Sequence, residues 1–203
     1  MSVFIGVTGG TGAGKSTVVR EMLKHGAVIL NADITAREAL LPESPITPRV
    51  IETLGHEIEL FSGVIDRRAL SRLVFSDPEK LCALNRIMHP YIREQMLNAA
   101  NTALRIYREK SVVVFDAPLL IEAGMKDDMD EIWLVTAPTE LRAERLKRRD
   151  RLDDEQIMNR LRARVSDDEL KTHADVVIEN DGDLRSLISK VDRLFKERIH
   201  TKL

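Results

Sequence analysis

Five short apolar runs alternate with helical patterns along the chain. Continuous apolar runs of this kind are typical of strands buried on both faces of a parallel sheet. The runs are Val3–Thr8, Ala27–Leu30, Ser111–Asp116, Glu131–Thr136 and Asp175–Glu179. Helical patterns fill the intervals, as in Thr17–His25, where Val18 and Met22 lie four positions apart and share a face. The alternation predicts an α/β fold with a five-stranded parallel sheet flanked by helices.

The interval between the second and third runs is the longest, and it loses strand character. From Leu41 to His89 the apolar residues recur with helical spacing, and Asp66 and Asp77 stand where N-caps belong. Met88-His89-Pro90 interrupts the pattern, so we expect a helix break there. The expected helices are Pro48–Leu54, Arg67–Phe75, Pro78–Met88 and Tyr91–Arg108. These patterns predict a helical insertion between strands two and three.

Gly9 to Ser16 reads G-x-x-x-x-G-K-S, the spacing of the phosphate-binding P-loop. Glycines let successive backbone N–H groups turn inward as an anion-binding nest, and Lys15 adds a point charge for the outer phosphates. Ser16 is suited to place its hydroxyl on Mg²⁺. An apolar run precedes the motif and a helical pattern follows it, which is the context that a P-loop requires. The alternative is a Gly-rich turn that binds nothing.

Aspartates follow two of the apolar runs. If the first two strands are parallel, Asp33 and the P-loop both lie at the carboxyl edge of one sheet, where α/β folds bind ligands. Asp116 has the apolar-run-then-Asp form of a Walker B element, which can hold Mg²⁺ through water. Each aspartate could instead have a purely structural role. Asp33 could be the N-cap of a helix that starts near Ile34, and Asp116 could cap the next turn.

An arginine-rich helix opens at Pro138, after the fourth strand. Arg142, Arg145 and Arg149 follow i, i+3, i+7 and therefore share a face suited to reach over a triphosphate. The alternative is a solvated helix with internal pairs such as Glu144 with Arg148, although this face is expected to lack internal partners.

Composition describes an ordinary globular chain of 203 residues, 43% hydrophobic and 32% charged. The net charge of −2 gives no reason to expect nucleic acid or an anionic membrane as partner. The single cysteine, Cys82, cannot form an internal disulfide and is expected to be a small core residue. No signal-like stretch is visible, and the five histidines show no metal-ligand spacing. We expect a cytoplasmic protein, with a monomer favoured.

A P-loop alone does not name a function, but absences narrow the choice. No Asn-Lys-x-Asp element for guanine and no L-S-G-G-Q-type signature is present. A small acceptor kinase fits the chain length, the helical insertion and the arginine-rich helix.

Further motifs resemble the dephospho-coenzyme A kinase family. They span almost the whole chain, and adenylate, shikimate and gluconate kinases do not share the later ones. The matching residues are the Thr8–Ser16 loop, Ala32-Asp33 with Ala36-Arg37, Asp66-Arg67-x-x-Leu70, Val74-Phe75, His89-Pro90, Pro118-Leu119-Leu120-x-Glu122, Ala174-Asp175-x-Val177-Ile178 and Asn180-x-Gly182.

This resemblance implies transfer of the ATP γ-phosphoryl group to the ribose 3′-hydroxyl of dephospho-coenzyme A, with Mg²⁺. Asp33 would accept the proton of the attacking hydroxyl, and Lys15 and Arg145 would assist the transfer. Substrate contacts are expected from Asp33, Arg67, His89 and Leu119, and metal contacts from Ser16 and Asp116. The ATP-binding candidates are Gly10, Thr11, Gly12, Ala13, Gly14, Lys15, Ser16, Thr17, Arg142, Arg149, Asn180 and Gly182, the last two against adenine.

The resemblance also implies the P-loop kinase fold, with a helical substrate-binding insertion and a helical lid. We expect one domain over 1–203, in which the core comprises 1–40, 111–137 and 174–203. The substrate subdomain would cover 41–110 and the lid 138–173.

Two departures from the family pattern limit this transfer of roles. Asn31 stands where many members have Asp, and Arg164 stands where the family has glutamine. An adenylate-kinase-like enzyme acting on a nucleoside monophosphate stays an alternative, because Arg67, Arg68, Arg72 and Arg86 could grip an acceptor phosphate. A nucleotide-binding regulator without transfer activity is the alternative from another class.

Overall fold

A computed structural model of the chain describes residues 2–107, 111–150, 153–162 and 165–199. The chain divides into two compact units, the first comprising residues 1–30 and 100–203 and the second residues 31–99. None of the helices in the described ranges combines the length and the apolar character needed to cross a membrane.

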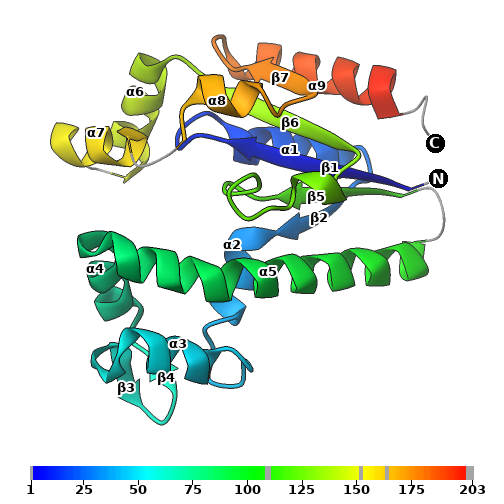
Figure 1. The fold of residues 1–203 in the computed structure, drawn as a ribbon. Helices are drawn as coiled ribbons and strands as arrows, with labels where there is room; N and C mark the ends of the chain where they lie inside the picture. Colours follow the sequence, from blue (N-terminus) through cyan, green and yellow to red (C-terminus); the bar gives the residue numbers. More distant parts are fainter. Residues whose placement is uncertain (1, 108–110, 151–152, 163–164, 200–203) are drawn as a thin grey trace. The chain divides into compact units, whose positions relative to one another are not determined.

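The first unit is built on a five-stranded sheet with strand order β2-β5-β1-β6-β7 (Figure 1). Strand β1 pairs in parallel with β5 on one side and with β6 on the other, and β6 pairs in parallel with β7. This arrangement confirms the predicted five-stranded parallel sheet. The strands are β1 Val3–Gly9, β2 Val28–Asn31, β5 Val112–Asp116, β6 Glu131–Thr136 and β7 Val176–Glu179.

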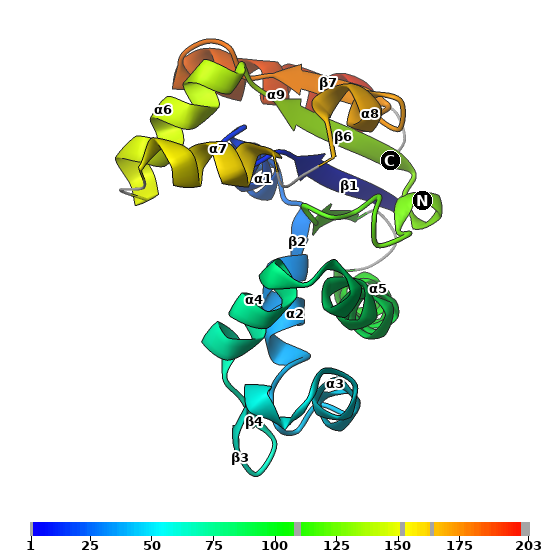
Figure 2. The same ribbon diagram turned by 60° about the vertical axis from the view of Figure 1, so that its left-hand side comes forward.

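Helices α1 (Lys15–Lys24) and α9 (Leu184–Ile199) pack side by side in the first unit (Figures 1 and 2). Their apolar faces and the inner strands form one buried cluster that includes Met22, Trp133 and Phe195. The remaining helices of this unit are α6 Thr139–Asp150, α7 Asp154–Arg162, α8 Asp167–Lys171 and the short η2 Lys126–Asp128.

The second unit is mainly helical, as the sequence predicts, but it also contains a short antiparallel ribbon. Strands β3 (Glu59–Phe61) and β4 (Val64–Ile65) pair across a turn in which Ser62 and Gly63 have φ values of 44° and 82°. Left-handed residues at both turn positions are typical of tight hairpins. Strands of two and three residues are too short for a periodic signal. The other elements are α2 Ala32–Glu38, α3 Thr47–Leu54, η1 His56–Ile58 and α4 Arg67–Ser76.

Helix α5 runs unbroken from Pro78 to Tyr107 with Pro90 inside it, so the expected break at Met88-His89-Pro90 is wrong. Interior proline removes one backbone hydrogen bond and disfavours the helix by about 3 kcal/mol. Met88, Ile92 and Met96 are buried on either side of Pro90, and their packing offsets that cost. The N-cap prediction for this helix is confirmed, since Asp77 Oδ1 accepts from the N–H of Glu79 at 2.9 Å.

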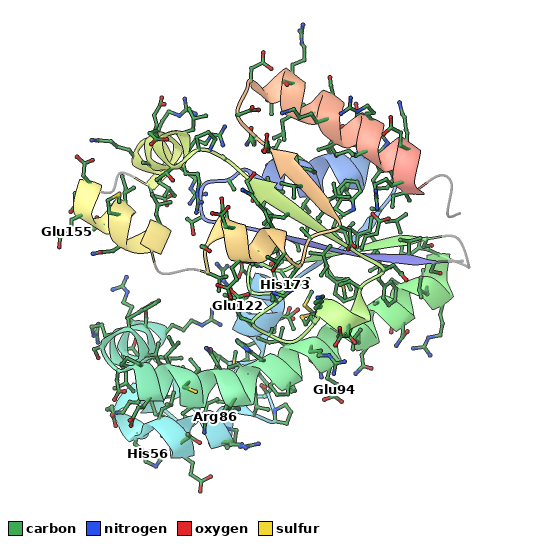
Figure 3. All side chains as sticks on the ribbon, turned by 45° about the horizontal axis from the view of Figure 1, so that its top comes forward. His56, Arg86, Glu94, Glu122, Glu155 and His173 are labelled. Atoms are coloured by element: carbon green, nitrogen blue, oxygen red, sulfur yellow. The ribbon has the colours of Figure 1, made fainter. Side chains whose placement is uncertain are left out.

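Cys82 is exposed on α5, so the expectation of a buried core cysteine is wrong. Arg86, one turn later and labelled in Figure 3, donates to its Sγ at 3.4 Å. The apolar neighbours in sequence place Cys82 in a helix but do not settle which face it occupies.

Candidate active site

The loop between β1 and α1 has the geometry of a phosphate cradle. Gly12 and Gly14 have φ values of 81° and 103°, which only glycine adopts without strain. Gly14 is the N-cap of α1, and no side chain caps this helix end. The first N–H groups of an α-helix have no partner within the helix, so this end favours an anion. Ser16 and Thr17 follow Lys15 in the first turn, with Ser16 exposed.

Two loop glycines also leave space for side chains from distant elements. A Cβ on Gly10 would meet the guanidinium of Arg142, and a Cβ on Gly14 would meet the side-chain amide of Asn180. The sequence motif explains these glycines by the backbone nest alone. The structure adds that larger residues would displace Arg142 and Asn180.

Arg142 is buried against the loop with a relative exposure of 7%. Its Nε donates to the carbonyl oxygen of Thr11 at 2.9 Å, and its Nη1 lies 3.3 Å from both carboxylate oxygens of Asp167. Asp167 lies on α8, so this ion pair is not internal to α6. The expectation that the arginine face lacks internal partners is instead wrong for Arg149, which pairs with Asp150 of the same helix. No sequence motif predicts Asp167 as the partner of Arg142, because the two residues lie 25 positions apart in the chain.

Arg145 connects the loop to the end of β7. Its Nη1 donates to the carbonyl oxygen of Gly12 at 3.3 Å, and its Nη2 donates to both the carbonyl and the side-chain oxygen of Asn180 at 3.2 Å. Asn180 is buried, and its Nδ2 donates to the carbonyl oxygen of Ala13 at 2.7 Å. Arg145 and Asn180 thus fix the loop through hydrogen bonds to its carbonyl oxygens.

Arg149 has different surroundings from the other two arginines of its face. It donates to Asp150 at 2.6 and 2.9 Å, and its side chain is 64% exposed. Hydrogen bonding from Arg149 holds the pKa of the Asp150 carboxyl below its usual range, with a further contribution from Arg160. Arg151 and Arg164 lie outside the described residues.

Lys15 and Asp116 form an ion pair at the carboxyl end of the central strands. Asp116 is the last residue of β5, and the parallel register places it opposite Val7 of β1. Both side chains are largely buried, with 13% and 8% exposure. The Asp116 carboxylate and the Ser16 hydroxyl both carry hard oxygen atoms, the ligand type that Mg²⁺ prefers.

Asp33 lies in the second unit, as the second residue of α2, and its side chain is exposed. The alternative of Asp33 as an N-cap is wrong, because the helix begins at Ala32 and Asn31 is the cap. The Asn31 Oδ1 accepts from the N–H of Ile34 at 3.0 Å. Asn31, which departs from the family pattern, thus caps α2, and the carboxylate of Asp33 is exposed to solvent.

The other candidates for substrate contacts occupy separate elements. In the second unit, Arg67 donates to the carbonyl oxygen of Arg37 at 2.7 Å, and His89 lies partly buried on α5. In the first unit, Leu119 follows β5 and is 39% exposed, and Gly182 lies in the exposed turn after β7.

Comparison with known proteins links these features to one enzyme family. A sequence model described as dephospho-CoA kinase matches residues 3–186. The dephospho-CoA kinase of Bacillus licheniformis is 39% identical over 194 residues, covering 96% of this chain and 96% of the relative. The dephospho-CoA kinase of Geobacter metallireducens is 40% identical over 195 residues, again covering 96% of each chain.

Solved structures show the same fold. A crystal structure from Thermus thermophilus superposes with a TM-score of 0.78 at 33% identity, covering 97% of this chain and 98% of the other. The dephospho-CoA kinase of Campylobacter jejuni superposes with a TM-score of 0.73 at 22% identity over 100% of both chains.

Proposed function

Because this chain belongs to the dephospho-CoA kinase family, we propose how its residues divide the work of that reaction. The family uses ATP to phosphorylate the ribose 3′-hydroxyl of dephospho-coenzyme A, which is the last step of coenzyme A biosynthesis. The observation that supports the assignment of the donor site best is the uncapped helix end at Gly14, with Lys15 at its first position.

On the donor side, the loop amides from Gly10 to Thr17 bind the β- and γ-phosphates of ATP. Lys15 exchanges its ion pair with Asp116 for the outer phosphates. Ser16 and Asp116 are the groups that would hold Mg²⁺. When bound, the metal ion supplies positive charge that offsets the charge of the phosphates.

On the acceptor side, Asp33 receives the proton of the attacking hydroxyl. Its exposure and the resemblance of Ala32-Asp33 to the family pattern support this role. A loose transition state needs a positioned acceptor more than a strong base, so an ordinary carboxylate is sufficient. Arg67, His89 and Leu119 contribute contacts to dephospho-coenzyme A.

Residues 138–173 act as the lid over a core of 1–40, 111–137 and 174–203, with 41–110 as the substrate subdomain. Arg145 and Arg149 differ in their contacts, which supports different roles for them. Arg145 holds loop carbonyls, whereas the exposed Arg149 can turn from Asp150 to a phosphate. Asn180 and Gly182 lie next to the adenine. Lid closure excludes water, which otherwise competes as acceptor.

An acceptor panel tests the proposed function. Coupled ATP assays would use dephospho-coenzyme A, AMP, CMP and shikimate as separate acceptors, and we expect turnover with the first alone. Turnover with AMP but not with dephospho-coenzyme A would replace this function by that of a nucleoside monophosphate kinase.

Asp33→Asn separates the proposed base from a binding role. We expect kcat to fall at least about tenfold, which corresponds to about 1.4 kcal/mol of barrier, while ATP binding is retained. A smaller loss would remove Asp33 from the role of base. Asp77→Asn, at an N-cap of α5, is the matched control and should leave kcat unchanged.

We also propose that the protein is a monomer in the cytoplasm. The single cysteine, Cys82, fits a reducing compartment. Size-exclusion chromatography with light scattering tests the oligomeric state.

A further inference from the structure

Three metal-ligating side chains meet at the end of α1 opposite the phosphate loop. Glu21, His25 and Asp192 each offer one possible ligand atom, and these atoms all lie within 4.8 Å of one another. Glu21 and His25 stand four positions apart at the end of α1, and Asp192 comes from α9. No other trio of His, Cys, Asp or Glu in the described ranges meets this condition.

We propose that Glu21, His25 and Asp192 form a binding site for a transition-metal dication of the zinc type, which ties α1 to α9. One imidazole nitrogen and two carboxylate oxygens match the ligands of three-residue zinc sites, with water in the fourth position. Tetrahedral ligands at about 2.0–2.2 Å from the metal are about 3.3 Å apart, so small side-chain rotations close the site.

Two contacts restrict the orientation of the His25 ring. Its Nε2 lies 2.7 Å from Asp192 Oδ1, and its ring stacks on Phe195 with centroids 5.0 Å apart and planes 17° apart. The stacking keeps the ring in one orientation, and a metal ion bound by Nε2 and Asp192 would replace the hydrogen bond between these two side chains. The His25 and Asp192 side chains are 21% and 36% exposed, which leaves a path for an ion from solvent.

Charge at this position also favours a cation. Glu21 is buried with 7% relative exposure near the C-terminal end of α1, where the helix dipole disfavours negative charge. A second carboxylate, Asp192, lies within the same small group. In the described part of the chain, Lys24 bonds one oxygen of Glu21, Oε2, at 2.6 Å, and its own side chain is 60% exposed. A dication between the carboxylates would offset their repulsion more effectively than the single charge of this largely exposed lysine.

Direct metal binding tests the site in untagged, full-length protein without nucleotide. Equilibrium dialysis should find one Zn²⁺ ion bound per chain. Co²⁺ bound at the same site should show the visible absorption that is typical of low-symmetry coordination. Asp116→Asn should keep the bound Zn²⁺ ion, which distinguishes its site from the proposed Mg²⁺ position. His25→Gln and Asp192→Asn should weaken Zn²⁺ binding at least about tenfold.

His56→Gln is the matched control, because His56, labelled in Figure 3, lies 2.8 Å from Glu59 in the second unit, and among the described residues this pair has no third ligand. It should leave Zn²⁺ binding unchanged. Lys24→Gln removes the competing cation from an exposed position, so it should tighten binding without disturbing the fold.

Retained kinase activity would show that the variants are folded. A wild-type protein that binds no Zn²⁺ at micromolar concentrations, or a His25→Gln variant that binds as tightly as wild type, would overturn the proposal. Weaker binding by Lys24→Gln would also contradict it.

Discussion

Arg142 and Asp167 form an ion pair against the back of the phosphate-binding loop, with side-chain exposures of 9% and 24%. The same guanidinium donates through Nε to the carbonyl oxygen of Thr11. Asp167 thus compensates the charge of an arginine whose hydrogen bond positions the loop.

Arg142→Ala should reduce kcat/KM for ATP about tenfold, since the loop loses an anchor and Asp167 loses its partner. Asp167→Asn should reduce kcat/KM for ATP only about two- to threefold, because the hydrogen bond from Arg142 to Thr11 remains. Steady-state kinetics measures both. Arg160→Ala, which removes a surface ion pair with Asp150, is the control and should behave as wild type. Equal kinetics for Arg142→Ala and wild type would exclude the anchoring role.

Gly14→Ala should abolish most of the activity, because it combines a φ of 103° with a collision against Asn180. Gly26→Ala is the matched control, since φ there is 87° and the space around it is open. The control should lower the free energy of unfolding by about 1 kcal/mol through backbone strain alone, with kcat unchanged. Urea unfolding and steady-state assays separate the two effects, and similar kcat values for both variants would refute the steric argument.

Asp116→Asn should raise the Mg²⁺ concentration for half-maximal activity about tenfold. The amide keeps the size of the side chain but removes the negative charge that binds the cation. Asp130→Asn is the control, because Asp130 accepts the N–H of Phe4 in the same unit and an amide oxygen can do the same. A Mg²⁺ titration that is unchanged in Asp116→Asn would leave this residue with a structural role only.

Asn31→Ala should lower the free energy of unfolding by about 1 kcal/mol, because α2 loses the bond from the N–H of Ile34. Asn31→Asp should retain the stability, since both residues cap equally well. Chemical unfolding of the two variants is the measurement. A destabilised Asn31→Asp would show that the side-chain amide has a further partner that a carboxylate cannot satisfy.

Asp66 is expected to make a pH-dependent contribution to the free energy of unfolding. Hydrogen bonds from the N–H groups of Ala69 and then Arg68 lower the pKa of its carboxyl below the usual value. Because the folded pKa is the lower one, the contribution is present above about pH 4 and is lost as the pH falls further. The difference in urea midpoint between wild type and Asp66→Ala, which has no capping side chain, should therefore shrink from pH 7 to pH 3, and a constant difference would contradict this linkage.

Much of the fold could be predicted because its signals are local. Short apolar runs predict the parallel strands, and Asp66 and Asp77 predict helix starts that the structure confirms. Prediction fails where long-range packing outweighs local preference, as at Pro90 within α5. It also fails for the ribbon β3–β4, whose strands are too short to carry a period.

The sequence by itself determined the phosphate loop and the family, since consecutive residues and ordered motifs encode both. Only the tertiary structure decided which distant side chains support that loop. Asp167 reaches Arg142, and Asn180 reaches Ala13, across 25 and 167 positions of the chain. Asp192 likewise meets His25 only where α9 packs on α1. Such contacts depend on how folded elements pack, and no spacing within one element records them.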